Sequence, residues 1–403
     1  MKKPSLAIIF LTVFIDVIGF GIILPLLPRY IERFGGKGAL IGLVIGSFPL
    51  MQFIFSPIWG RLSDKIGRRP IILISNGCTA IAYALFALAA DTGGKPGLAL
   101  VLASRVFAGI CGGNISVVSA YIADISPSEK RSQSMALLGL AFGLGFILGP
   151  AIGAFGAKEY GLAGPGWVAS ALCGFNFVLS IFILKESLNT ALVSVDERPR
   201  LEQWLYTLKH PKLGALIGLH FLSTFCFASF ETTLPLLLSK AYNYDETKLG
   251  YIFSYCGAVT TFTQGLLIRV LSKKFDDARL ISMSLIIVGL SLALMPLAKE
   301  ITILMILLTI FSAASNINRT PTIGQISVNA VQGEQGATLG IAHSAATLAF
   351  VFGPIFSTAL YAMNANLSFL ATAVLSFAGG ISAWRFLISA SMRHGKGTET
   401  IAG

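Results

Sequence analysis

Long apolar runs separated by short polar segments dominate the chain. A helix needs about 20 mostly apolar residues to cross a bilayer, and twelve runs of this kind follow one another. They lie near residues 6–27, 40–59, 71–90, 98–123, 135–157, 167–184, 213–238, 249–271, 280–298, 301–323, 337–363 and 367–389. The pattern predicts an all-α membrane protein with twelve transmembrane helices.

One long polar segment, 185–211, divides these spans six and six. The two halves also echo each other, since Leu-Pro-Leu-Leu at 24–27 recurs at 234–237. We therefore predict an N-terminal six-helix bundle over 1–184, a cytoplasmic linker over 185–211, and a C-terminal six-helix bundle with a short cytoplasmic tail over 212–403. Two parallel six-helix repeats are typical of transporters whose substrate site lies between them near the middle of the membrane.

Composition excludes several other classes of protein. The chain is 54% hydrophobic and 12% charged, whereas soluble domains are about 25% charged. The net charge of +11 is dispersed between apolar runs, so no basic module for nucleic acid is indicated. The five cysteines show no CxxC spacing, and neither a His-Glu-x-x-His pattern nor a Walker loop is present. We expect no disulfide framework, no bound metal, no cofactor and no enzymatic activity.

The distribution of lysine and arginine predicts the orientation. With both termini inside, nineteen Lys and Arg fall on the cytoplasmic side and eight on the opposite side. Cytoplasmic loops carry the excess of these residues in membrane proteins. The bias favours cytoplasmic termini, an even number of spans, and a multi-pass protein of the plasma (bacterial inner) membrane.

The loop after the second span carries the most specific motif. Residues 60–69 read GRLSDKIGRR, which fits G-x-L-[SA]-D-[RK]-x-G-R-[KR] and resembles the signature of the major facilitator superfamily. The alternative interpretation is a positive-inside loop with a glycine turn. The resemblance implies a conformational latch made of Gly60, Asp64, Gly67, Arg68, Arg69 and Asp124.

The same resemblance implies partners for two of these side chains. Asp64 would cap the start of the eleventh span near Gly336 and Ala337, because a carboxylate stabilises the positive end of a helix. Arg68 would pair with Asp124 at the end of the fourth span.

The fifth span reads GFILGPAIG at 145–153, which resembles the G-x-x-x-G-P-x-x-G motif of antiporters in this superfamily. Glycines four residues apart let helices approach closely, and a proline removes one helical hydrogen bond. We interpret Gly145, Gly149, Pro150 and Gly153 as a hinge, with generic helix packing as the alternative.

Two acids and one arginine inside the predicted spans are the leading candidates for coupling. Asp16 opens an Asp-x-x-Gly-x-Gly pattern in the first span, Glu231 lies in the seventh, and Arg105 belongs to an Arg-x-x-x-Gly pattern in the fourth. Charged groups at this depth are costly, rare and usually functional. The patterns resemble the drug:proton antiporters, closest to the tetracycline-efflux branch, which implies that these residues couple protons or substrate. Each acid could instead be a buried hydrogen-bond partner of a neighbouring span.

Other polar residues within the spans are predicted to line a cavity: Gln52, Asn114, Gln264, Asn316, Asn318 and Arg319. His220 and His343 could titrate near neutrality; we interpret them as packing residues, because a lone histidine in a helical bundle is usually one.

The chain departs from the tetracycline exporters at positions that matter in that branch. Ala82 and Thr260 stand where those exporters carry an aspartate and a histidine, and the ninth span lacks an acid. These departures argue against tetracycline as the substrate.

Taken together, the sequence predicts proton-coupled efflux of a small organic molecule or drug by alternating access. Its partners would be that molecule, protons and the lipid bilayer, with no nucleic acid and a monomeric state. Two alternatives remain, a metabolite symporter or facilitator of the same superfamily and a non-transporting membrane receptor.

Overall fold

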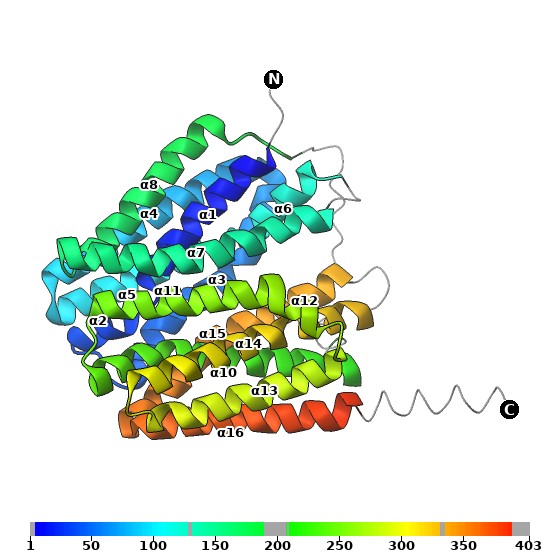
Figure 1. Cartoon of the computed structure of the whole chain (residues 1–403). Coiled ribbons are helices and arrows are strands. Elements are labelled where there is room, and N and C mark those ends of the chain that lie inside the picture. The colour runs from blue at the N-terminus through cyan, green and yellow to red at the C-terminus, as the bar shows by residue number, and fades with distance from the viewer. Residues whose placement is uncertain (1–4, 128–130, 189–206, 208, 331–334, 389–403) are drawn as a thin grey trace. The chain divides into compact units, whose positions relative to one another are not determined.

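The computed structural model describes residues 5–127, 131–188, 207, 209–330 and 335–388, in which helices dominate and no strand occurs (Figure 1). The helices before the central linker are α1 (Leu6–Ile23), α2 (Leu27–Arg33), α3 (Ala39–Ile66), α4 (Arg68–Thr92), α5 (Gly94–Cys111), α6 (Ile115–Ile125), α7 (Arg131–Tyr160) and α8 (Gly164–Ile183). Those after it are α10 (Pro211–Tyr242), α11 (Glu246–Phe262), η3 (Thr263–Leu267), α12 (Ile268–Leu271), α13 (Asp277–Leu294), η4 (Met295–Leu297), α14 (Ile301–Asn329), α15 (Gln335–Met363), α16 (Ala365–Ala383) and η5 (Trp384–Ile388). Most of the predicted linker, 189–206, lies outside the described residues.

In the described chain, 11 helical stretches are long and apolar enough to cross a membrane. Each coincides with a predicted span, which confirms an all-helical, multi-pass membrane protein. The remaining predicted span, 249–271, is divided into α11, the π-helical turn η3 and α12.

The first predicted span is interrupted before its end. Its helix stops at Ile23, and a turn at 24–26 leads into α2. Pro25 lies in this turn and Pro28 follows it in the first turn of α2, and proline has no backbone N–H with which to continue a helical ladder. The matching Pro235 lies inside the continuous α10, so the two halves differ here.

The fourth predicted span is also interrupted, at residues 112–114 between α5 and α6. Two consecutive glycines favour this break, because glycine is poorly held in a helix. Side chains from neighbouring helices bond the carbonyls left at the end of α5. Gln52 Nε2 donates to Gly112 O at 2.9 Å, and Ser75 Oγ donates to Cys111 O at 2.7 Å. Gln52, predicted to line a cavity, thus has a partner in the break.

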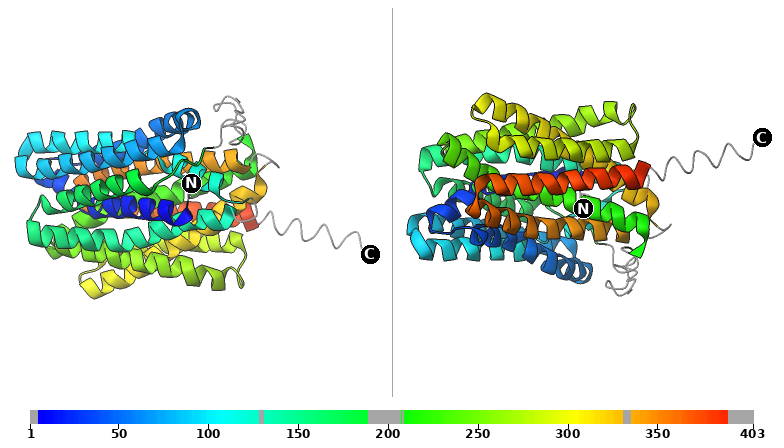
Figure 2. Two further views of the ribbon diagram at one scale, coloured as in Figure 1. Left: turned by 90° about the horizontal axis from the view of Figure 1, so that it is seen from above. Right: turned by 90° about the horizontal axis from the view of Figure 1, so that it is seen from below.

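The chain divides into two compact units. The first comprises 1–196 and 232–258, and the second 197–231 and 259–403. Within the first unit α1 packs along α7 and α8, and within the second α13 packs along α14 and α16 (Figure 2). One boundary, between 196 and 197, falls in the predicted linker, whereas the other two fall inside α10 and α11. The predicted bundles at 1–184 and 212–403 therefore remain a prediction.

Candidate functional site

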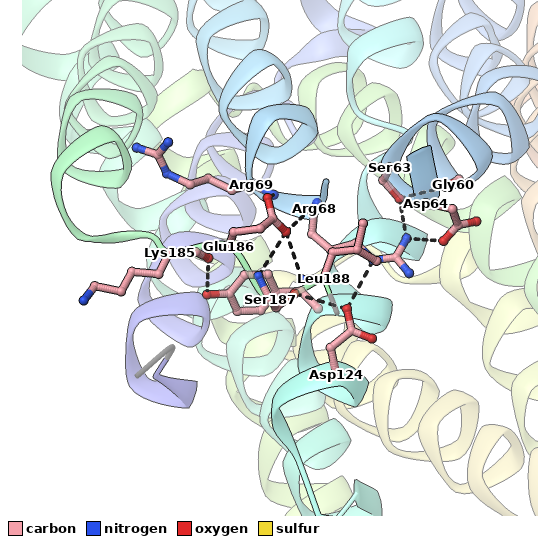
Figure 3. A network of polar contacts seen from close by, with 11 residues as sticks. Gly60, Ser63, Asp64, Arg68, Arg69, Asp124, Lys185, Glu186, Ser187 and Leu188 are labelled. Atoms are coloured by element: carbon pink, nitrogen blue, oxygen red, sulfur yellow. Dashed lines mark hydrogen bonds and ion pairs between the residues drawn. The ribbon is translucent and has the colours of Figure 1, made fainter. Parts of the chain in front are cut away.

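The loop between α3 and α4 is organised around Arg68 (Figure 3). Gly67 has a φ of 107°, a conformation that glycine adopts without strain, and it turns the chain from one helix into the next. Arg68 then lies 8% exposed among acceptors. Its guanidinium contacts Asp64 Oδ1 at 2.5 Å, Ser63 Oγ at 2.6 Å and Asp124 Oδ2 at 3.3 Å. One arginine thus links the end of α3 to the end of α6.

Sequence reasoning missed Glu186, which completes this network. Its carboxylate accepts hydrogen bonds from the backbone nitrogens of Arg68 at 2.8 Å and Arg69 at 3.1 Å, and so caps the start of α4. The Arg69 side chain donates to Leu184 O at 2.8 Å and to Ile181 O at 2.7 Å, at the end of α8. The start of the central linker is therefore attached to the 60–69 loop. An acid directly after an apolar span was the only signal available for it.

The two partners expected for this loop have different outcomes. Arg68 contacts Asp124, as expected. Asp64, which was expected to cap the start of the eleventh span, contacts Arg68 within the first unit. Residues 331–334, which precede the start of α15, lie outside the described chain. The cap of Asp64 on the start of the eleventh span stays a prediction. Gly60 accepts a hydrogen bond from Ser63 Oγ at 2.7 Å through its carbonyl.

Asp16, in the middle of α1, is held by asparagines from three other parts of the first unit. Asn176 Nδ2 on α8 donates to Asp16 Oδ1 at 2.9 Å. With its amide nitrogen turned toward the acid, Asn76 on α4 donates to Asp16 Oδ2 at 2.9 Å and to Ile72 O at 3.1 Å. Asn114, in the break between α5 and α6, lies close enough to interact with the carboxyl group. We call Asn76, Asn114 and Asn176 the asparagine cage.

Two members of the cage, Asn76 and Asn176, were missed by sequence reasoning, although both are fully buried. Asn176 Nδ2 also donates to Thr12 O at 3.0 Å, while its Oδ1 is buried without a hydrogen-bond partner. The cage thus supplies hydrogen-bond donors to Asp16, and it also contains one acceptor without a partner, the Oδ1 atom of Asn176.

Arg105 on α5 is 3% exposed and pairs with aromatic rings. Its guanidinium carbon lies 5.5 Å from the ring centres of Tyr83 and Phe86, which is within cation–π range. Its Nη2 donates to Ser104 Oγ at 3.1 Å, but its buried Nε has no hydrogen-bond partner. Among the described residues, no carboxylate forms an ion pair with it. Tyr83 is close enough to both Arg105 and Asp16 to interact electrostatically with each.

The predicted hinge residues of α7 lie against α1. A methyl group on Gly149 would stand 2.8 Å from Ile18 O and 2.8 Å from the Cα of Gly21. Gly145 and Gly153 approach Val17 and Ile22 in the same way. The spacing of these glycines therefore lets the Asp16 helix and the Pro150 helix touch along their backbones.

Some of the polar residues predicted in the second unit are hydrogen-bonded to neighbouring helices, and others are exposed or half-buried. Asn318 Nδ2 on α14 donates to Ile281 O and to Ser284 Oγ of α13, both at 3.1 Å, and its side chain is buried between the two helices. Asn316 Nδ2 donates to Thr260 Oγ1 at 3.1 Å. Gln264 is exposed in the π-helical turn, a feature often found at functional sites. Glu231 is half-buried on α10.

Metal chemistry finds no support in the part of the chain that the structure describes. No group of three or more His, Cys, Asp or Glu side chains there could hold an ion.

Known membrane transport and resistance proteins are similar to this chain over nearly its whole length. The chain is 30% identical to the class E tetracycline resistance protein of Escherichia coli over 357 residues, covering 87% of this chain and 86% of that one. It is 27% identical to multidrug resistance protein 2 of Bacillus subtilis (strain 168), covering 92% of each chain. In fold it resembles a bacterial homologue of the human lysosomal transporter Spinster, with a TM-score of 0.77, 15% identity, and coverage of 94% of this chain and 96% of that one.

The sequence pattern of a family of transporters, not enzymes, also matches residues 9–297, which is well over half of the chain. This chain belongs to the Major Facilitator Superfamily.

Proposed function

We propose that the protein exports a small organic molecule in exchange for protons by alternating access. The resemblance to tetracycline and multidrug resistance proteins over most of the chain supports export of a drug-like compound. The single observation that carries proton coupling is the asparagine cage around Asp16, an acid placed in the middle of a membrane helix.

In the proposed topology the chain crosses the membrane twelve times, and 246–271 is one of these spans despite its π-helical turn. Both termini and the 60–69 loop face the cytoplasm of a bacterial cell, and the protein works in the inner membrane as a monomer. Bundles at 1–184 and 212–403 rock about a central site, as paired repeats do in other transporters.

Asp16 is the proposed proton carrier of the first half. Asparagine offers both a donor and an acceptor, so the cage suits either protonation state of the acid. Its amide nitrogens hold the carboxylate, and the unused Oδ1 of Asn176 can accept from the protonated form once the side chains turn. Glu231 is the proposed second acid, and Arg105 biases the protonation of Asp16 through Tyr83.

The network around Arg68 is the proposed latch. Arg68, Asp64 and Asp124 hold the ends of α3, α4 and α6 together in one conformational state. Release of these contacts would accompany the switch to the other state.

The test uses the full-length protein in sealed liposomes with an outward drug gradient and a pH-sensitive dye inside. Exchange predicts drug-dependent proton movement opposite to the drug, which a symporter would reverse. Asp16→Asn and Glu231→Gln should each lower this flux at least tenfold, since the substituted side chains cannot release a proton. Asp91→Asn, at an exposed acid on α4, is the matched control. Full drug-dependent flux in both variants would reject the assignment of the two acids.

A further inference from the structure

A cluster of basic side chains lies within the second unit. It consists of His220 on α10, Arg319 on α14 and His343 on α15, which are close enough to interact electrostatically with one another. His220 is 6% exposed, whereas Arg319 and His343 are exposed. Each residue lies about two to three turns from the end of its helix. Sequence reasoning treated the two histidines as separate packing residues. We call these three residues the basic cluster.

The basic cluster has no acid of its own. Among the described residues, no carboxylate forms an ion pair with Arg319, and no side-chain hydrogen bond is made by either histidine ring. By contrast, Arg68 at the 60–69 loop contacts two carboxylates. Arg319 is also exposed, so its guanidinium is open to an anion. Arg319 is therefore set up to pair with a charge that the described chain does not supply.

Aromatic rings stand next to the basic cluster on the same helix faces. On α10, Phe227 follows His220 by seven residues, and on α15, Phe350 follows His343 by seven, which in each case is about two turns along one face. Phe227 and Phe350 meet edge to face with ring centres 6.4 Å apart. Phe227 also stacks with Phe311 of α14 at 6.5 Å. The three helices of the basic cluster thus share an aromatic cluster one or two turns further along.

Glu231 extends the same face of α10. It follows His220 by eleven residues, which is about three turns and about 16 Å along the helix. Basic groups, aromatic rings and an acid therefore succeed one another along one stripe. An aromatic molecule with a negative group at one end matches the first two parts of this stripe, and leaves the acid to carry a proton.

We propose that the basic cluster is the subsite for the anionic group of the exported molecule, with Phe227 and Phe350 against its aromatic part and the buried Phe311 packed behind Phe227. This inference rests on the proposed export function and deepens it by assigning a substrate class, aromatic organic anions. Arg319 supplies the charge and a fork of N–H donors that fits a planar or tetrahedral oxyanion. Each histidine ring adds one N–H donor even when neutral.

The test compares two probes with the same ring and opposite permanent charge, naphthalene-1-sulfonate and trimethyl(1-naphthylmethyl)ammonium. Neither becomes neutral, so neither crosses the bilayer unaided as an acid or a base. Probe-driven proton movement is measured in liposomes with the full-length protein, with ethidium and tetracycline as further compounds. The variants are Arg319→Gln, Arg319→Lys and, as a control at an exposed arginine of α12, Arg269→Gln.

We expect the sulfonate to drive proton movement in the unaltered protein. Arg319→Gln should reduce the sulfonate response at least tenfold, Arg319→Lys should keep it within about threefold, and Arg269→Gln should leave it unchanged. A response to cationic compounds alone, or an equal loss of all responses in Arg319→Gln, would overturn the subsite while export stands. No proton movement with any compound would overturn the export function itself.

Discussion

Asp16 shows how a membrane helix can hold an ionisable side chain with neutral partners alone. The asparagine cage satisfies the carboxyl group from α4, α8 and the break between α5 and α6. Asn176 is the best placed of the three, because it also bonds the Thr12 carbonyl one turn before Asp16. Removal of a buried partner leaves the remaining group without its hydrogen bond, which costs about 1–3 kcal/mol.

Asn176→Ala should therefore lower the stability of the folded protein by about 1–3 kcal/mol and reduce drug-dependent proton flux severalfold. Thermal unfolding in detergent and liposome flux measure the two effects. A double-mutant cycle with Asp16→Asn tests whether Asn176 acts through the acid. If the two losses simply add, Asn176 has a structural role that does not involve Asp16.

The isolation of Asp16 could be predicted from the sequence, but the cage could not. An acid within an apolar run is visible in one span, whereas its partners come from residues 60 to 160 positions further along the chain. Only packing of separate helices brings them together. The same reason explains why His220 and His343 were each taken as lone residues.

The start of α4 depends on a cap that comes from outside the 60–69 motif. Glu186 bonds the first two backbone nitrogens of α4, and a carboxylate at this position also interacts favourably with the helix dipole. Glu186→Ala should destabilise the protein by about 1 kcal/mol and loosen the first turn of α4. Thermal unfolding and hydrogen exchange at 68–72 measure this.

Glu300 is the matched control for this prediction, because it stands at the N-cap of α14 without a side-chain capping bond. Glu300→Ala should leave the melting temperature nearly unchanged. Equal losses in the two variants would show that the hydrogen bonds of Glu186 to the start of α4 contribute nothing measurable.

The contact between α1 and α7 depends on glycine backbones rather than on side chains. Gly149→Ala would place a methyl group 2.8 Å from Ile18 O and should cost about 1–3 kcal/mol with a matching loss of transport. Gly139→Ala on the same helix meets nothing within 4 Å and should be neutral or slightly stabilising. Thermal unfolding and flux on both variants separate the close contact from a general effect of glycine in α7. If the Gly149→Ala protein is as stable and active as the Gly139→Ala protein, the close contact between α1 and α7 is not important for stability or transport.

The apolar pattern locates the membrane helices well but does not reveal where they break. Hydropathy reports how much of a segment avoids water, and the interrupted stretches 6–33 and 94–125 are as apolar as continuous ones. Proline alone does not decide the matter, because Pro150 and Pro235 lie inside continuous helices while Pro25 lies in a turn. A break needs neighbouring side chains that bond the freed groups, as Gln52 does at Gly112.

For the molecule as a whole, the repeat in the sequence and the compact units do not coincide. Segment 232–258, from the second sequence repeat, belongs to the first unit. There α11 packs on α7, where a methyl group on Gly250 would stand 2.5 Å from Pro150 O. Ion pairs also join the start of α11 to α2, because Glu246 lies 3.5 Å from Arg29 and 3.6 Å from Arg33. Hydropathy and repeats carry no information on such contacts, since in an alternating-access cycle they would form in one state and separate in the other.

These ion pairs yield a prediction about the conformational equilibrium. The Glu246 carboxylate is 16% exposed and serves two arginines, so its loss should cost the state that contains them about 1 kcal/mol, or roughly a fivefold shift in population. Spin labels at the exposed positions Lys37 and Ala241 report the separation of α2 and α10. Glu246→Gln should increase the fraction of long distances, and high salt should do the same in the unaltered protein, because screening weakens exposed pairs. Glu159→Gln, which removes only an exposed pair with the adjacent Lys158 at 3.9 Å, should leave the distribution unchanged. Identical distributions in both variants and at both salt concentrations would mean that helix packing alone, through contacts such as Gly250 on α7, keeps these segments together.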